Sequence, residues 1–304
     1  MGYNISMKID VAIIGGGPAG LTAGIYLCRA GLDAICFESL GVGGQAALSY
    51  DIANYPGFKN ISGFELTNLM AEQAKACGLK INFEGVKQVT KARGGFKVKT
   101  SKDEYVASKV ILACGHEPRK LGLKDEEKFI GKGVSFCASC DGNFFKNKSV
   151  AIVGGGDTAM EDAVYLSKIC KYVTIINRTD QFKAKPYELE RAKELKNVKF
   201  ITSATVSELM GKDLLEKIKF KTGDEEKTIK VDGLFLAIGH KPNLEFLNLN
   251  LEKDKNGYII VDENMQTNIK NVYACGDIVS KSFKQIVTAC ADGAIAGNAC
   301  IGGK

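Results

Sequence analysis

The sequence predicts an α/β fold of two domains, with the second domain inserted into the first. Residues 11–39 (VAIIGGGPAGLTAGIYLCRAGLDAICFES) and 150–178 (VAIVGGGDTAMEDAVYLSKICKYVTIINR) resemble each other closely. Each copy has an apolar strand, a glycine-rich turn, a helix with apolar residues three and four positions apart, and a second apolar strand. Because such a unit is too large for a solenoid repeat, we expect two Rossmann-like nucleotide-binding domains of three-layer ββα form.

The first glycine-rich turn predicts a dinucleotide site. Gly15 permits a tight strand-to-helix turn, Gly17 lets backbone approach a pyrophosphate, and Gly20 lets the helix pack on the strand. The helix that starts near Pro18 directs its unpaired N–H groups at the phosphates. Glu38 ends the second strand, where a carboxylate would accept hydrogen bonds from a ribose.

The second turn is similar but lacks the acid. Gly154 and Gly156 keep the first two positions, and Ala159 replaces the third glycine, a variant seen with phosphorylated dinucleotides. A 2′-phosphate is tolerated where that acid is absent, and Arg178 and Lys183 could pair with it. Ordinary surface charge is the alternative interpretation of both basic residues.

Between and after the two copies, the pattern predicts the remaining elements of the first domain. Residues 64–77 have the spacing of an amphipathic helix. Residues 81–112 alternate as in a β-hairpin, with a turn at Gly94-Gly95. The segment YACGD (273–277) returns to the first domain and precedes a helix that extends to about residue 300.

Two similar segments mark the crossings between the domains. The apolar strands VILACG and LFLAIG end in CGHEP (114–118) and IGHKP (238–242), each with a proline. The expected first domain is therefore discontinuous, 1–117 and 246–304. The inserted NAD(P)-binding-like domain covers 118–245 and carries the sequence CASC.

Composition excludes several classes of protein. The 304 residues include 41 Lys+Arg and 35 Asp+Glu, and a dispersed net charge of +6 gives no reason to expect a nucleic-acid partner. The longest apolar runs are far shorter than the ~20 residues of a membrane span. With only 2 His in the chain, we expect no metal site.

The 10 cysteines divide into two groups. Eight stand alone in apolar segments, as expected of core thiols in a reducing cytoplasm. Cys137 and Cys140 form the only close pair, and a disulfide between cysteines at this spacing would be strained and prone to exchange. Asp141 follows the pair directly and is the available proton donor and acceptor.

The motifs GGGPAG, GGQ, NYPGF, CASCDG, GGGDTA, AIGHKPN and CGD, in this order and spacing, resemble those of low-molecular-weight thioredoxin reductases. The resemblance covers nearly the whole chain. It implies a cytoplasmic homodimeric flavoprotein that reduces thioredoxin disulfide through FAD and the cysteine pair, with electrons from NADPH. Cys140 would take electrons from the flavin, Cys137 would attack the partner's disulfide, and Asp141 would handle the leaving proton.

The resemblance also assigns residues to FAD. Gly15, Gly17, Gly20 and Glu38 would hold its ADP half. Asp277 would bind the ribityl chain. The flavin and ribityl contacts would come from a further set: Gly44, Gln45, Asn54, Lys284 (usually Arg in the family) and Gln285.

The electron donor stays open at this point. The family's 2′-phosphate motif is H-R-R-x-x-x-R, whereas this chain has Asn177-Arg178-Thr179 and then Lys183. Each lost charged hydrogen bond would weaken the 2′-phosphate site by about 1–3 kcal/mol. NADH and reduced ferredoxin are therefore alternative donors. An FAD-dependent dithiol oxidase is an alternative function, although an oxidase does not need the second glycine-rich turn.

Overall fold

The computed structural model describes residues 7–49, 52–242 and 244–302. The chain divides into two compact units, Met1–Glu117 with Lys241–Lys304, and Pro118–His240. The two crossings, β7 (His116–Pro118) and β16 (His240–Pro242), pair as a two-stranded sheet. The second unit thus ends at His240, within the second crossing.

The first unit is built on a seven-stranded sheet. Its strands are β1 (Met7–Ile14), β2 (Ala34–Phe37), β3 (Lys80–Asn82), β4 (Val86–Ala92), β5 (Gly95–Thr100), β6 (Glu104–Leu112) and β17 (Val272–Ala274). Their order in the sheet is β3-β2-β1-β6-β5-β4, and β17 pairs with β6. Strands β3, β2, β1, β6 and β17 are parallel. The expected α/β fold is confirmed for this unit.

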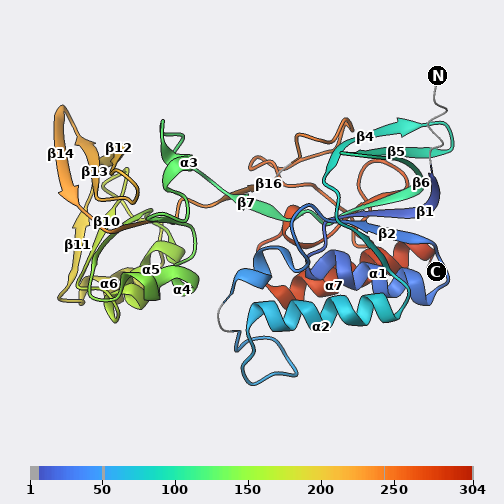
Figure 1. The fold of residues 1–304 in the computed structure, drawn as a ribbon, viewed down its shortest axis with the longest axis horizontal. Helices are drawn as coiled ribbons and strands as arrows, with labels where there is room; N and C mark the ends of the chain where they lie inside the picture. The colour runs from blue at the N-terminus through green and yellow to red at the C-terminus, as the bar shows by residue number, and fades with distance from the viewer. Residues whose placement is uncertain (1–6, 50–51, 243, 303–304) are drawn as a thin grey trace. The chain divides into compact units, whose positions relative to one another are not determined.

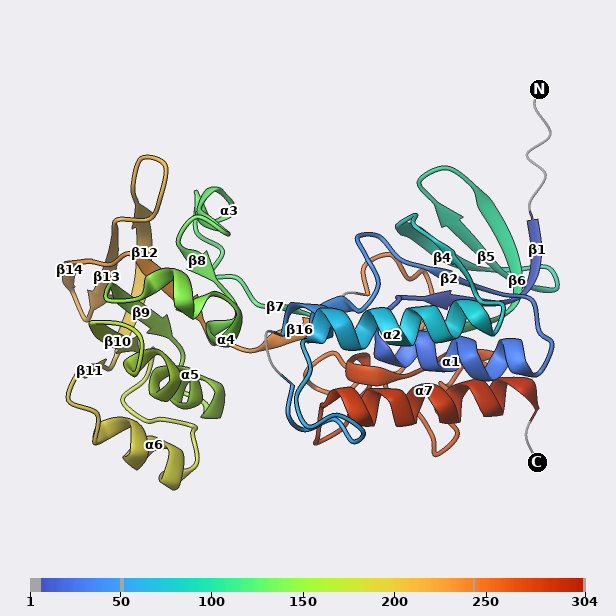
Figure 2. The same cartoon turned by 60° about the horizontal axis from the view of Figure 1, so that its bottom comes forward.

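Three helices cover one face of this sheet: α1 (Pro18–Arg29), α2 (Gly63–Ala76) and α7 (Ile286–Ile301) (Figures 1 and 2). Val11 and Ile13 of β1 point into the core beneath the helices. Ala12 and Ile14 point into a second core, which includes Val89 of the β4–β5 hairpin. Alternation along one buried strand therefore builds the three layers.

The second unit repeats this plan on a smaller scale. Its parallel sheet has the order β11-β10-β9-β15-β8, with β8 Val134–Ser135, β9 Ser149–Val153, β10 Tyr172–Ile176, β11 Val198–Ile201 and β15 Gly233–Leu236. The helices α4 (Ala138–Asp141), α5 (Asp157–Ser167) and α6 (Pro186–Lys193) lie on one face of it (Figure 2). An antiparallel sheet of β12 (Ala204–Met210), β13 (Lys217–Thr222) and β14 (Glu225–Lys230) completes the unit, beside the short helix α3 (Glu126–Phe129).

One local expectation needs correction. The β4–β5 turn consists of Arg93 and Gly94, because Gly95 already pairs with Ala92. The segment GVGGQ leads into a 3₁₀ helix, η1 (Gly44–Leu48). Two further 3₁₀ turns, η2 (Gly142–Phe145) and η3 (Gly276–Ile278), follow the cysteine pair and β17. Two-residue turns that contain glycine match the twist of a hairpin, and the shift of the turn by one residue pairs Ala92 with Gly95 instead of Arg93 with Phe96.

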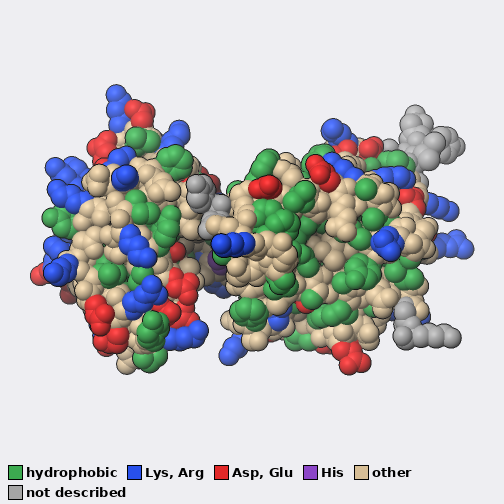
Figure 3. All heavy atoms as spheres, turned by 90° about the horizontal axis from the view of Figure 1, so that it is seen from below, with side chains coloured by type: hydrophobic (Ala, Val, Ile, Leu, Met, Phe, Trp, Pro, Cys, Tyr) green, Lys and Arg blue, Asp and Glu red, His purple; other side chains and the backbone are tan. Residues whose placement is uncertain are grey.

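The surface mixes charges of both signs. Basic and acidic side chains lie interspersed over the face shown in Figure 3, with scattered hydrophobic side chains between them. Within the described ranges, none of the helices is both long and apolar enough to cross a membrane.

Candidate functional site

The β1–α1 turn is shaped by close backbone contacts. Gly15 has φ +109°, and a Cβ on it would lie 2.4 Å from the carbonyl oxygen of Ala113. A Cβ on Gly20 would lie 2.0 Å from the Gly15 oxygen. Gly17 caps α1 without a side chain, and a Cβ there would reach no atom nearer than 4.0 Å. The first and third glycines therefore pack the turn, while the second leaves open space at the start of α1.

Glu38 holds this turn to the end of β2. One carboxylate oxygen, Oε2, accepts a hydrogen bond from the Gly16 N–H at 2.8 Å. The other, Oε1, accepts bonds from the N–H groups of Ser39 and Leu40 at 2.8 and 3.0 Å. Carboxylate oxygens have further lone pairs, so this geometry leaves Glu38 able to accept a ribose hydroxyl as well.

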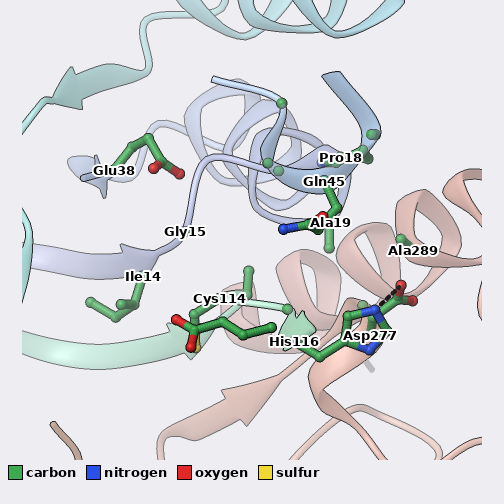
Figure 4. Close-up of a pocket in the computed structure, with 18 of the residues that line it drawn as sticks. Ile14, Gly15, Pro18, Ala19, Glu38, Gln45, Cys114, His116, Asp277 and Ala289 are labelled. Carbon is green, nitrogen blue, oxygen red and sulfur yellow. Dashed lines mark ion pairs between the residues drawn. The ribbon is translucent and has the colours of Figure 1, made fainter. Parts of the chain in front are cut away.

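A cavity of about 710 Å³ runs along the carboxyl ends of these strands. Figure 4 places Glu38 on one side of it, and His116 and Asp277 on another. Nine of the predicted FAD residues line this cavity: Gly15, Gly17, Glu38, Gly44, Gln45, Asn54, Asp277, Lys284 and Gln285. Gly20, the tenth, lies behind the turn rather than at the wall, in accordance with its packing role.

Residues far apart in the sequence meet at the wall of the cavity. The Asn54 side-chain amide donates to Gln285 Oε1 at 3.0 Å, across 231 positions of the chain. Gln285 also forms a capping box with Thr288 at the start of α7. This pairing fixes the orientation of both amides at the cavity and places the α7 N-terminus there.

A chain of charged groups surrounds Asp277. Its carboxylate lies 3.8 Å from His116 Nε2 and 3.8 Å from Lys281 Nζ, and Figure 4 marks the His116 contact. Lys281 in turn pairs with Asp292 at 2.6 Å. Asp277 thus links His116 of β7 to Lys281 and, through it, to Asp292 of α7.

Lys284 is held by backbone and by a ring. Its Nζ donates to the carbonyl oxygens of Asp277 and Val279 at 2.5 and 3.0 Å, and lies 3.7 Å from the centre of the Tyr258 ring. Burial lowers the pKa of Lys284 below its usual value. The Lys284 ammonium group is a compact point charge at the cavity wall. The arginine that is usual here in low-molecular-weight thioredoxin reductases would present a planar guanidinium group instead.

The second glycine-rich turn has its own tight packing. Gly154 has φ +151°, and a Cβ on it would lie 2.3 Å from the Ala237 oxygen. A Cβ on Gly156 would contact nothing within 4 Å, so the start of α5 is open in the same way as the start of α1. Ala159 is fully buried behind it.

The loop after β10 is organised by an asparagine. Asn177 is buried, and its amide nitrogen donates to the backbone oxygens of Thr179 and Gln181 at 3.0 and 2.9 Å. The Lys183 N–H donates to the Gly155 oxygen at 2.7 Å, which ties the loop to the glycine-rich turn. The side chains of Arg178 and Lys183 are exposed, so both remain available to an anionic ligand.

Cys137 and Cys140 form a disulfide around the start of the short helix α4, with their Cα atoms 5.3 Å apart. Both residues are partly exposed. The Cys140 N–H donates to Cys137 Sγ at 3.2 Å, so a negative charge on that sulfur would face a backbone donor.

Ser135 links Asp141 to the pair. Its hydroxyl donates to Asp141 Oδ2 at 2.6 Å, and its oxygen accepts from the Cys137 N–H at 3.1 Å. The sequence reasoning missed Ser135. Its place two residues before the first cysteine, at the end of the short strand β8, is the signal that could have identified it.

The other cysteines are only in part the core thiols that were expected. Cys36, Cys170, Cys275 and Cys300 are buried, whereas Cys28, Cys77, Cys114 and Cys290 are partly exposed. Burial raises the pKa of Cys36 and of Cys114 to about 12. Thiols with such a pKa stay protonated at neutral pH and are poor nucleophiles. Among the described residues, no group of three or more metal-ligating side chains is present.

Comparisons with known proteins agree with this arrangement. Residues 9–293 match the model of the pyridine nucleotide-disulphide oxidoreductase family. The chain is 41% identical to the thioredoxin reductase of Listeria monocytogenes, over 95% of this chain and 91% of that protein. It is 42% identical to that of Helicobacter pylori, over 95% and 96%. The crystal structure of Lactococcus lactis thioredoxin reductase superposes with a TM-score of 0.84 at 36% identity, covering 96% of this chain and 98% of that one.

Proposed function

Because the chain belongs to the pyridine nucleotide-disulphide oxidoreductase family, we propose that it is a thioredoxin reductase that uses FAD and NADPH. The observation that carries the proposal is the Cys137–Cys140 disulfide, which lies in the unit that has its own glycine-rich turn. A nucleotide site and an exchangeable disulfide in one unit, and a dinucleotide cavity in the other, are the parts that such a reaction needs.

The first unit fits FAD. A cavity of about 710 Å³ is large enough for a dinucleotide. The open face of Gly17 at the N-terminus of α1 suits a pyrophosphate, Glu38 suits the ribose of the ADP half, and Asp277 suits the ribityl hydroxyls. Asn54, Lys284 and Gln285 supply donors along the same wall. When bound, FAD would accept a pair of electrons from NADPH and pass them to the disulfide.

Reduction of the disulfide requires the chain's own residues to manage charge and protons. Breaking the Cys137–Cys140 bond with two electrons creates sulfur anions, and the Cys140 N–H already points at Cys137 Sγ. We assign proton transfer at these sulfurs to Asp141, which follows Cys140 directly and accepts a hydrogen bond from Ser135. By the family's pattern, Cys140 receives the electrons and Cys137 attacks the disulfide of thioredoxin.

The second glycine-rich turn supports NADPH over the alternative donors. Its backbone geometry favours a pyrophosphate at the start of α5. An enzyme that takes electrons from reduced ferredoxin, or a dithiol oxidase, would not need such a nucleotide site. Asn177 is engaged with the loop backbone and offers no carboxylate for the 2′-hydroxyl of NADH. Arg178 and Lys183 are cations beside that position, which favours a 2′-phosphate.

Thioredoxin or a similar redoxin is the proposed acceptor, and the cytoplasm the proposed compartment. We also propose a homodimer. Exposed apolar side chains on two helices of the same layer of the first unit support it: Phe64 and Leu69 on α2, and Val287 and Ile295 on α7. A second copy of the chain would remove their apolar surface from water.

Anaerobic titration of the purified holoenzyme tests this function. NADPH should bleach the flavin absorbance at lower concentration than NADH, and oxidised thioredoxin should restore it. In the Cys137→Ser variant, NADPH should still bleach the flavin absorbance, but the reduced variant should fail to pass electrons to thioredoxin. Bleaching by reduced ferredoxin alone would reject the nucleotide donor, and no recovery with thioredoxin would reject the acceptor.

A further inference from the structure

Helix α5 packs directly against the segment that carries the redox cysteines. Gly142 follows Cys140 by two residues, and a Cβ on Gly142 would lie 2.9 Å from Leu166 Cδ2 and from Tyr165 Cε1. Ala138, between the two cysteines, is buried in the same hydrophobic cluster as the inner face of α5. The pair therefore sits on one flank of this helix.

Asp162 lies on that flank. It precedes Tyr165 by three positions and Leu166 by four, and residues at these spacings share one side of a helix. The opposite flank belongs to α6, because α6 follows β10 whereas α4 follows β8 at the other edge of the sheet. Figures 1 and 2 both show α4 beside α5.

The surroundings of Asp162 disfavour its charge. The residue is partly buried, whereas its neighbour Glu161 is exposed. Burial, followed by the charge of Glu161, raises the pKa of Asp162 to about 7. The elements packed on α5 carry further titratable side chains. Those at α4 are Cys137, Cys140 and Asp141, the one on β10 is Tyr172, and those on α6 are Tyr187, Glu188, Glu190, Arg191 and Lys193. Strand β9 and the turn Gly142–Phe145 carry none.

We propose that Asp162 is a positioning residue of the redox pair, whose charge sets how readily the reduced cysteines form a thiolate. This inference rests on the proposed disulfide chemistry. Reduction breaks the S–S bond with two electrons, and two protons complete the dithiol. Loss of one of these protons to solvent gives the thiolate that attacks the partner.

The direction of the effect follows from electrostatics. An ionised Asp162 beside α4 opposes a second negative charge on either sulfur, whereas a protonated Asp162 does not. Ionisation of Asp162 and of the thiol are therefore antagonistic. The dithiol would titrate as a coupled system with an additional inflection near neutral pH.

Alkylation of the reduced pair measures this coupling. The holoenzyme is reduced with dithiothreitol, freed of reductant under argon, and treated with iodoacetamide between pH 5.5 and 9.5. Mass spectrometry follows modification of Cys137 and Cys140. The wild-type rate should show two inflections; Asp162→Asn should show one and react about three- to tenfold faster at pH 8, since one pKa unit corresponds to tenfold.

Two further variants make the result specific. Glu190→Gln removes a carboxylate from the opposite flank of α5 and should change the rate less than about twofold. Asp162→Glu keeps the carboxyl and should retain two inflections, which provides the readout should Asp162→Asn fail to fold. A wild-type profile without the neutral inflection, or one that Asp162→Asn leaves unchanged, would overturn the proposal. Neither readout uses NADPH or thioredoxin, so a failed reductase assay would contradict the proposed function alone.

Discussion

Ser135 and Asp141 act as one unit at the residue scale. The hydroxyl of Ser135 donates to the carboxylate while its oxygen accepts the Cys137 N–H. One small side chain thus orients the expected proton carrier and the backbone of the attacking cysteine together. A hydrogen bond to a charged group contributes about 1.5–3 kcal/mol, so its loss is large enough to measure.

Ser135→Ala should lower turnover with thioredoxin about tenfold, because about 1.4 kcal/mol in a barrier is a tenfold change in rate. Steady-state kinetics with NADPH and thioredoxin check this. Ser167→Ala, which removes only a bond within α5, serves as the matched control and should stay within about twofold. Equal losses in both variants would contradict an orienting role for Ser135.

Asp162 should also make stability depend on pH. Its pKa of about 7 in the folded chain lies above its ordinary value of 3.8. Protonated Asp162 therefore contributes favourably to the free energy of unfolding. This contribution is fully present below about pH 4 and is lost as pH rises through about 7. Since the side chain is partly exposed, screening limits the effect, and wild type should lose about 1–2 kcal/mol relative to Asp162→Asn between pH 5 and 8. Urea unfolding at several pH values measures it, and parallel stability curves for the two proteins would contradict it.

At the scale of elements, the two strand–turn–helix copies share one backbone plan and differ at the third glycine position. Gly20 lets α1 approach the Gly15 oxygen so closely that no Cβ fits between them. In the second copy a methyl group is accommodated, and α5 begins with an i→i−3 bond from the Ala159 N–H to the Gly156 oxygen at 3.1 Å. The first turn is therefore the less tolerant of the two.

Gly20→Ala should weaken FAD binding at least about tenfold, because the helix must move away from the turn. The absorbance of retained flavin, and the FAD concentration that restores it, measure the loss. Gly41→Ala is the control: its Cβ would meet nothing within 4 Å, and its flavin content should equal that of wild type. Full flavin content in Gly20→Ala would show that α1 can shift without cost.

At the scale of the whole molecule, each unit has its own hydrophobic cores. Two clusters belong to the first unit and two to the second. Each of these clusters, as far as the described residues show, stays within one unit. Separate cores permit separate unfolding, and a ligand stabilises only the unit to which it binds.

Calorimetry of the protein with and without FAD should therefore show two transitions, of which FAD raises only one. At a free concentration of 100 times Kd, the stabilisation should be about 2.7 kcal/mol. In Gly20→Ala the FAD-dependent shift should shrink while the other transition stays in place. A single transition that moves as a whole would mean that the units unfold together.

The glycine-rich turns could be predicted because their information is local. Gly15, Gly17, Gly20 and Glu38 stand at fixed spacing on one strand–turn–helix unit, and the structure brings them together as expected. The cysteine pair is local in the same way. Local spacing also identified α2 and the end of α7 to within a residue or two. The turn at Arg93-Gly94 was placed one residue late, since two adjacent glycines fit either register.

Only the tertiary structure decided which distant residues meet. The pairing of Asn54 with Gln285 spans 231 positions, and α5 packs through Tyr165 and Leu166 against Gly142, next to the cysteine pair. Tyr258 beneath Lys284 and His116 beside Asp277 are further contacts of this kind. Periodicity determines which face of an element is buried, but not which other element covers it. Strand order and helix packing make that choice, and they depend on the free energy of the whole chain.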